Sequence, residues 1–105
     1  MVNDITDAEF EKKVLRSNLP VLVDFLATWC IPCKMVAPIV DKLSTRYECK
    51  VKFFKIDVDK NARIAGQYRV MSIPSLILFK GGAAVDTIVG AVPERTLVSH
   101  IDAVL

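Results

Sequence analysis

Residues 21–34 constrain the fold of this chain most, because they pass from a strand into a helix with little loop between. Residues 21–27 read VLVDFLA, which is apolar at both alternating sets of positions except at Asp24. A strand that is apolar on both faces is a central strand covered by helices on each side. Apolar residues then recur at helical spacing from Val36 to Tyr47, which predicts a long amphipathic helix. The segment therefore predicts an α/β fold.

The rest of the chain continues this alternation. Thr6 and Glu9 have the spacing of a capping box, which predicts a helix that ends near Asn18. Strands are expected over residues 51–58, 75–80 and 84–89. A short helix is expected over residues 64–68 and a last helix over 93–104. Residues 2–5 could form a short first strand, but their signal is weak. The first strands are parallel through a right-handed crossover, and the last two form an antiparallel hairpin. We expect a mixed sheet of four to five strands with helices on both faces, in a single domain over residues 1–105.

Composition excludes several classes of function. The formal net charge is only +2 in 105 residues, and no Lys/Arg cluster indicates a nucleic-acid or membrane-surface partner. No apolar run approaches the roughly 20 residues of a membrane span. The opening MVNDITDAEF lacks the basic and apolar regions of a signal peptide, so we expect a cytoplasmic protein, which we take to be a monomer.

Two cysteines stand at the junction of the central strand and the long helix. In Trp29–Cys30–Ile31–Pro32–Cys33, Pro32 suits the first turn of a helix. Cys30 then faces unpaired backbone N–H groups at the helix N-terminus, which favour the thiolate. Cys33 lies one turn further on, within reach of a disulfide. The pattern predicts thiol–disulfide exchange, with Cys30 as the exposed nucleophile and Cys33 as the more buried resolving cysteine.

The same pair is also half of a possible zinc site. Structural zinc requires four ligands, and only Cys49 and His100 remain, each alone and distant in sequence. We interpret Cys49 as a buried or half-buried passive thiol and His100 as a surface residue without a carboxylate partner. A redox-active dithiol carries the electrons itself, and no glycine-rich phosphate loop indicates a nucleotide or flavin, so we expect no metal and no cofactor.

Asp24 is an unusual residue for a buried strand. Desolvation raises the pKa of a carboxyl group, and a carboxyl with a raised pKa accepts protons near neutral pH. Asp24 could therefore deprotonate Cys33. The residues alone leave an alternative open, in which Asp24 forms a structural ion pair with Lys55 on the neighbouring strand.

The stretch VDFLATWCIPCK over residues 23–34 resembles the active-site segment of thioredoxins. Further matches follow in the family's order along the whole chain: the buried acid at Asp24, the helix-kinking proline at Pro38, the facing lysine at Lys55, the cis-proline loop at Ser72–Ile73–Pro74–Ser75 and the groove glycine at Gly90. The resemblance implies the thioredoxin fold and a protein disulfide reductase.

It also implies residue roles and partners. Cys30, Cys33, Asp24 and Lys55 would be catalytic. The substrate-binding residues would be Trp29, Ile31, Pro32, Ile73, Pro74, Val89 and Gly90. Electrons would come from a thioredoxin reductase and pass to oxidised protein substrates. A non-catalytic docking subunit and a more oxidising disulfide oxidase or isomerase are the alternatives.

Three residues depart from the family's usual pattern, and one of them is Leu26, at a position that is often aromatic. Ile31 replaces a glycine between the cysteines, and Met71 stands at a position that is often charged. Both changes make the surface around Cys30 more apolar. We therefore expect tighter docking of hydrophobic partner segments.

Overall fold

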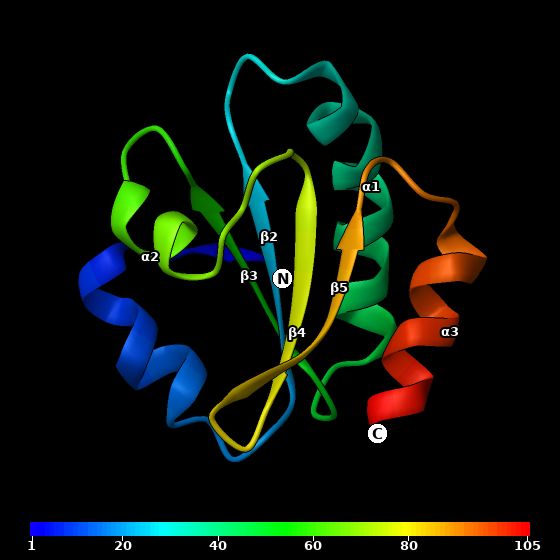
Figure 1. Ribbon diagram of the computed structural model, residues 1–105. Helices are drawn as coiled ribbons and strands as arrows, with labels where there is room; N and C mark the ends of the chain where they lie inside the picture. Colours follow the sequence, from blue (N-terminus) through cyan, green and yellow to red (C-terminus); the bar gives the residue numbers. More distant parts are fainter.

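The computed structural model describes all 105 residues and contains one five-stranded mixed sheet (Figure 1). The strands are β1 (Asn3–Asp4), β2 (Val21–Leu26), β3 (Lys52–Asp57), β4 (Ser75–Lys80) and β5 (Ala83–Val89), in the spatial order β1-β3-β2-β4-β5. β3 pairs parallel with both β1 and β2, whereas β4 pairs antiparallel with β2 and β5. The predicted mixed sheet is confirmed, and the short first strand makes the fifth.

Helices cover both faces of the sheet. α1 (Ile31–Arg46) and α3 (Glu94–Val104) lie on one face (Figure 1). α2 (Ala62–Gln67), the 3-10 helix η1 (Asp7–Glu9) and the π-helix η2 (Glu11–Leu15) lie on the other. Each face has its own apolar core, one built with Leu43 and Leu97 and the other with Phe10 and Ile64. No helix has both the length and the apolar character that a membrane crossing requires.

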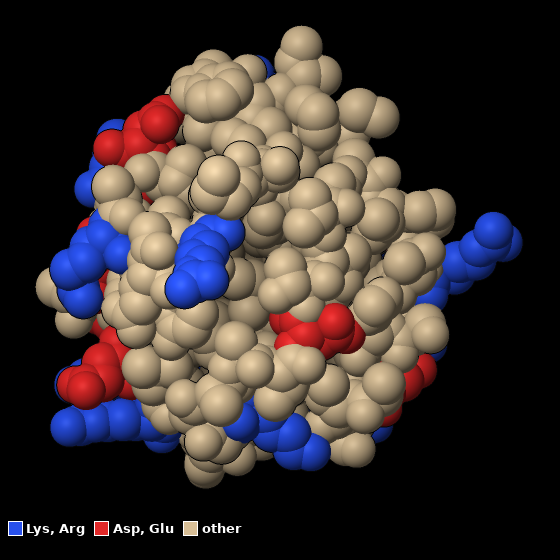
Figure 2. Space-filling model, in the orientation of Figure 1, with Lys and Arg blue, Asp and Glu red and all other residues tan.

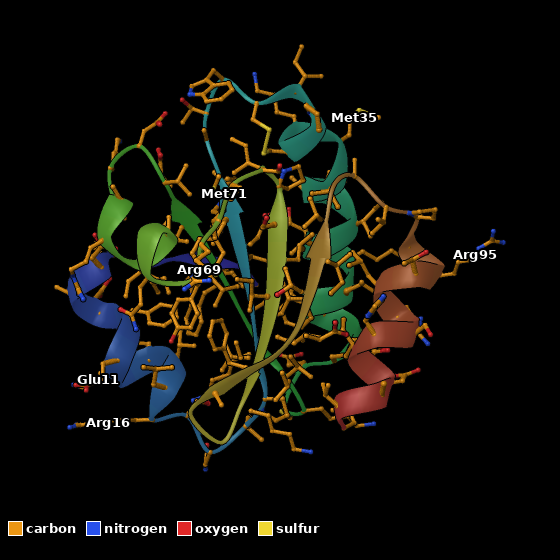
Figure 3. The ribbon with its side chains drawn as sticks, viewed as in Figure 1. Glu11, Arg16, Met35, Arg69, Met71 and Arg95 are labelled. Carbon is orange, nitrogen blue, oxygen red and sulfur yellow. A yellow bond between two sulfur atoms is a disulfide. The ribbon has the colours of Figure 1, made fainter.

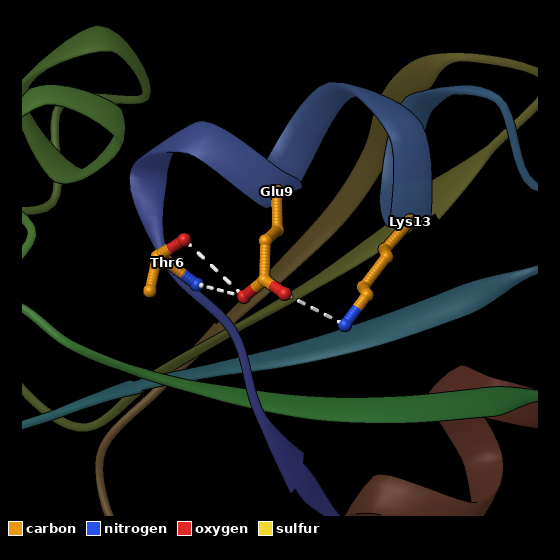
Figure 4. Close-up of polar contacts among 3 residues, drawn as sticks. All are labelled: Thr6, Glu9 and Lys13. Carbon is orange, nitrogen blue, oxygen red and sulfur yellow. Dashed lines mark hydrogen bonds and ion pairs between the residues drawn. The ribbon is translucent and has the colours of Figure 1, made fainter.

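The N-terminal helical segment begins as the sequence predicts. The backbone N–H of Thr6 donates to Glu9 Oε1 over 3.0 Å, and Lys13 Nζ lies 2.9 Å from Glu9 Oε2 (Figure 4). The hydrogen bond from Lys13, followed by that from the Thr6 backbone, lowers the pKa of Glu9. These contacts fix the first helical turn.

The predicted end of this segment near Asn18 is wrong, because η2 already ends at Leu15. The Ser17 hydroxyl donates to the Leu19 carbonyl over 2.9 Å and accepts from the Leu19 N–H over 3.2 Å. This local turn replaces the helical hydrogen bonds ahead of Pro20.

The alternation along β2 determines where Asp24 lies. Val21, Val23 and Phe25 belong to the core beneath α2, whereas Leu22 belongs to the core beneath α1 and α3. Since side chains alternate along a strand, Asp24 faces the α1 side with Leu22. Its register neighbour on β3 is Lys55.

Two expectations about single residues are wrong. Cys49 is exposed rather than buried, because it occupies the tight turn after α1 with a φ of 70°. In that turn the N–H of Lys50 donates to the Tyr47 carbonyl over 2.9 Å. His100 has a carboxylate partner after all, since its Nδ1 contacts Oδ2 of Asp86 where α3 packs beside β5.

Candidate active site

Cys30 and Cys33 form a disulfide at the start of α1, with their Cα atoms 5.2 Å apart. Cys30 is the N-cap residue of this helix, and its Sγ accepts a hydrogen bond from the Cys33 N–H over 3.2 Å. Pro32 lies in the first turn, where its missing N–H costs nothing. When the pair is reduced, the N–H groups and the positive end of the helix dipole favour a thiolate at Cys30. The predicted position of the pair is confirmed.

The predicted difference in exposure between the two cysteines is wrong for the disulfide form. Each is only 3% exposed. Both pack with Ala27, and the half-buried side chains of Leu26 and Ile73 lie against them. The bond to Cys33 and the hydrogen bond from its N–H hold the Cys30 sulfur against the helix end, away from solvent.

Asp24 is buried, with 2% of its surface exposed, and its Oδ1 has no hydrogen-bond partner. Burial raises the pKa of this carboxyl from 3.8 to about 7, and the positive charge of Lys55 opposes the increase. The structure contains no ion pair between Asp24 and Lys55. The geometry therefore favours a carboxyl that exchanges its proton near neutral pH over a structural ion pair.

The loop before β4 presents free backbone groups beside the disulfide. The peptide bond between Ile73 and Pro74 is cis, as the resemblance implies. The Gly90 N–H donates to the Pro74 carbonyl over 2.9 Å, and Gly90 has a φ of 94°, a conformation that favours glycine. The N–H and carbonyl of Ile73 have no partner. They are available to an extended peptide segment that adds as a strand.

Large apolar side chains are exposed around this loop. Trp29 is 66% exposed, Ile31 69% and Met71 91%, and Val89 at the end of β5 is also exposed. The Trp29 Nε1 donates to Asp59 Oδ2 over 2.7 Å. The upper part of the face drawn in Figure 2, above the middle of the sheet, is mostly uncharged. The expected apolar surface is confirmed.

Met35 is a further exposed apolar side chain near the cysteine pair, and the sequence pattern alone did not single it out. It is exposed near the start of α1, and Figure 3 shows the disulfide between Met35 and Met71. The available signal was its position outside the apolar face that Val36, Val40 and Leu43 define on α1. An exposed methionine beside a cysteine motif is a candidate docking residue.

A family model described as Thioredoxin matches residues 1–103. The chain belongs to the thioredoxin family. A thioredoxin of Synechocystis is 55% identical over 98 residues, which are 93% of this chain and 92% of that protein. A thioredoxin of Pyropia yezoensis is 50% identical over 101 residues, covering 96% of this chain and 94% of that protein. A chloroplastic thioredoxin M4 of Arabidopsis thaliana is 46% identical over 101 residues, covering 96% of this chain and 52% of that protein.

Family and geometry together establish the activity. The molecule has the thioredoxin fold and a cysteine pair at disulfide distance at the start of α1. It is a thiol–disulfide oxidoreductase that acts as a protein disulfide reductase, with Cys30 and Cys33 as its redox-active pair. The structure contains no cluster of three or more His, Cys, Asp or Glu side chains suited to binding a metal ion.

Proposed function

We propose that Cys30 is the attacking thiolate and Cys33 the resolving cysteine of the reductase. Cys30 attacks a substrate disulfide and releases one substrate thiol, which leaves a mixed disulfide on Cys30. Cys33 then attacks the Cys30 sulfur, and the second substrate sulfur leaves and takes up a proton. The substrate gains two electrons while the protein pair becomes the disulfide. The observation that carries these roles is the hydrogen bond from the Cys33 N–H to the Cys30 Sγ, because only Cys30 caps the helix.

Asp24 is the base for the second step, and the positive charge of Lys55 stabilises its carboxylate form. Asp24 takes the proton from the Cys33 thiol as Cys33 attacks. Its burial and its unpartnered Oδ1 support this role, since an unpaired buried carboxyl readily accepts a proton. The positive charge of Lys55 keeps the carboxylate form accessible.

The substrate docks as an extended segment on the apolar surface beside the disulfide. Ile73 supplies backbone hydrogen bonds, and Gly90 has no Cβ to obstruct the approaching chain. The side-chain contacts come from Trp29, Ile31, Pro32, Pro74 and Val89. This mode fits many protein substrates, because backbone pairing does not depend on sequence.

We further propose that residues 1–105 fold as one domain and act as a monomer in the cytoplasm. A thioredoxin reductase supplies the electrons that this domain carries to oxidised proteins. The bacterial thioredoxins among the relatives support a cytoplasmic location, while the chloroplastic relative makes a plastid the alternative. Fractionation of source cells followed by immunoblotting distinguishes the two compartments.

Single-cysteine variants test the assigned roles. Cys33→Ser is expected to accumulate a mixed disulfide with a protein substrate, visible by mass, and Cys30→Ser to form none. Cys49→Ser is the matched control, because this thiol is exposed and outside the site, and it should reduce insulin at the wild-type rate. Mixed disulfides that form on Cys33 instead would reverse the roles. Reduction that survives loss of both cysteines would favour the docking-subunit alternative.

A further inference from the structure

Asp24 opens into a small cavity behind the disulfide. The cavity has a volume of about 80 Å³ and is lined by Val2, Asp24, Leu26, Ala37, Val40, Asp41 and Lys55. One water occupies roughly 30 Å³ in the liquid, so the cavity has room for water molecules. Asp24 lines this cavity and its carboxyl makes no hydrogen bond within the protein, so such a water has an acceptor available to it.

The lining changes from buried to exposed along the cavity. Asp24 is buried, Lys55 is half-buried and Asp41 is exposed. The carboxylate of Asp41 takes part in no ion pair or side-chain hydrogen bond. The cavity therefore leads from the buried carboxyl to a free carboxylate at the protein surface.

The same face of α1 carries Cys33 and Asp41. Residues four and eight positions apart lie on one side of a helix, which aligns Cys33, Ala37 and Asp41. Ala37 and Asp41 line the cavity, and Cys33 is one turn above it toward the disulfide. This face of α1 therefore begins at the resolving Cys33, lies over Asp24 on β2 and ends at the exposed Asp41.

The cavity and the docking surface are separate. None of the exposed apolar residues around the disulfide, Trp29, Ile31, Met35, Met71 and Val89, lines the cavity. A bound substrate that covers this surface leaves the cavity mouth at Asp41 open.

We propose that the cavity is a rear exit for the proton of Cys33 and that Asp41 is its outer positioning residue. This inference rests on the proposed role of Asp24 as the base. The Cys33 thiol gives its proton to Asp24 as its sulfur bonds to Cys30 and the substrate thiolate leaves. Asp24 then passes that proton through water in the cavity to solvent at Asp41. The substrate thiolate takes its own proton from solvent, so protons and electrons balance.

The charges around the cavity give Asp41 a second effect. Lys55 on β3 and Asp41 on α1 are the charged groups that line the cavity with Asp24, while β4 contributes the apolar Leu76 as its strand neighbour. A carboxylate at the mouth disfavours negative charge on Asp24 and favours the movement of a proton outward. Loss of this charge lowers the pH at which Asp24 releases its proton.

The test uses the full-length protein in single-turnover reduction of a peptide disulfide, followed across neutral pH. Asp41→Asn removes the outer charge, and Asp41→Glu restores it. Ala37→Leu fills the cavity without changing charge. Glu48→Gln is the matched control, because it removes one exposed carboxylate that lies outside the cavity.

We expect Asp41→Asn to slow release of the second substrate thiol about three- to tenfold and to lower the midpoint of its pH profile by about 0.5 unit. Ala37→Leu slows the same step, whereas Asp41→Glu and Glu48→Gln behave as the wild type. The rate of the first attack by Cys30 stays unchanged in all four variants. If Asp41 had only a structural role, its substitution would not shift the midpoint of the pH profile without also changing the rate of the first attack by Cys30.

Asp24→Asn separates this inference from the proposed function. If Asp24→Asn slows thiol release but Asp41→Asn keeps the wild-type rate and midpoint, the rear exit is wrong and the base role stands. If Asp24→Asn also leaves the rate and its pH dependence unchanged, the proposed base role itself fails. If Glu48→Gln shifts the profile as much as Asp41→Asn, the effect is one of net charge and the inference is overturned.

Discussion

Asp24 combines a stability cost with its proposed chemical role. The carboxyl lies on the middle strand of the sheet, on the face where the neighbouring Leu22 belongs to the apolar core. Its ionised form is disfavoured there, because Oδ1 receives no hydrogen bond. The cost appears only above the pH at which the carboxyl of the unfolded chain ionises, so it is measurable as a dependence of stability on pH.

We predict that Asp24→Asn removes a pH-dependent loss of stability. Burial raises the pKa of Asp24 from 3.8 in the unfolded reference to about 7. Below the lower value both states hold the proton and the group costs nothing. As pH rises toward the higher value the unfolded state loses its proton first, so the free energy of unfolding falls by about 4 kcal/mol and then stays level.

The measurement is denaturant unfolding of the oxidised protein at several pH values. The stability advantage of Asp24→Asn over the wild type should grow as pH rises from about 4 to about 7 and then stay level. Asp4→Asn serves as a control for loss of an exposed carboxyl. An advantage that stays constant with pH would show that Asp24 is not a raised-pKa group.

Ile31 is the second residue whose substitution gives a prediction, in this case for substrate binding. It is 69% exposed directly between the cysteines. We predict that Ile31→Ala raises the KM for protein disulfides about fivefold with little change in kcat, because roughly 1 kcal/mol of apolar contact to the docked segment is lost. Val85→Ala, an exposed apolar residue on β5, is the control. Equal KM values for Ile31→Ala and wild type across several substrates would contradict the docking role.

At the scale of the elements, features that depend on residues close in sequence were predicted, whereas features that depend on tertiary contacts were not. The two-faced apolar run of β2, the hairpin of β4 and β5 and the Thr6–Glu9 contact depend on residues close in sequence and were predicted. The approach of His100 to Asp86 depends on how α3 packs beside β5, which periodicity does not encode. Likewise, the exposure of Cys49 follows from a left-handed turn that no glycine signals.

The active site shows the same division. The cysteine pair and its position at a helix start follow from spacing and Pro32. The cavity between Asp24 and Asp41 arises only when α1 crosses β2 and β3, since it is lined by all three elements. The cis peptide at Pro74 followed from the family resemblance alone, because most X–Pro bonds in folded proteins are trans.

The N-terminal helical segment is fixed to the sheet by aromatic packing, and this gives a prediction for a whole element. Phe10 is fully buried, with its ring centroid 5.3 Å from that of Phe79 on β4 and 5.6 Å from that of Tyr68. We expect Phe10→Ala to lower the free energy of unfolding by about 3–5 kcal/mol through lost contacts and the cavity left behind.

Phe10→Leu is the matched variant that keeps most of the buried volume, and it should cost much less. Denaturant unfolding measures both. Hydrogen exchange should show the largest loss of protection in η1 and η2. An equal loss in α3, on the opposite face of the sheet, would indicate that the segment is not an independent local unit.

At the scale of the whole molecule, four separate segments meet at one end of the sheet. The end of β2, the start of α1, the loop before β4 and the end of β5 supply the cysteines and the apolar surface around them. The rear cavity opens beneath α1, away from that surface. In the proposed mechanism the fold thereby gives substrate and proton separate access to the disulfide.

The last prediction concerns the redox potential of the folded protein. The Cys30 sulfur sits at a helix N-terminus, which stabilises the thiolate and so favours the reduced pair. A reference value for thioredoxins is about −270 mV, a property of the family rather than one calculated for this structure. We expect the Cys30–Cys33 pair to lie within about 30 mV of it, equivalent to roughly 1.4 kcal/mol for two electrons.

Equilibration with graded thiol–disulfide buffers, followed by alkylation and mass measurement, gives this potential. Ile31→Gly restores the residue usual for the family and shows what the isoleucine contributes. A wild-type potential near the reference agrees with a reductase that tolerates Ile31. A potential higher by many tens of millivolts, which returns to the reference in Ile31→Gly, would assign the isoleucine a role in making the pair more oxidising and would favour a disulfide oxidase or isomerase.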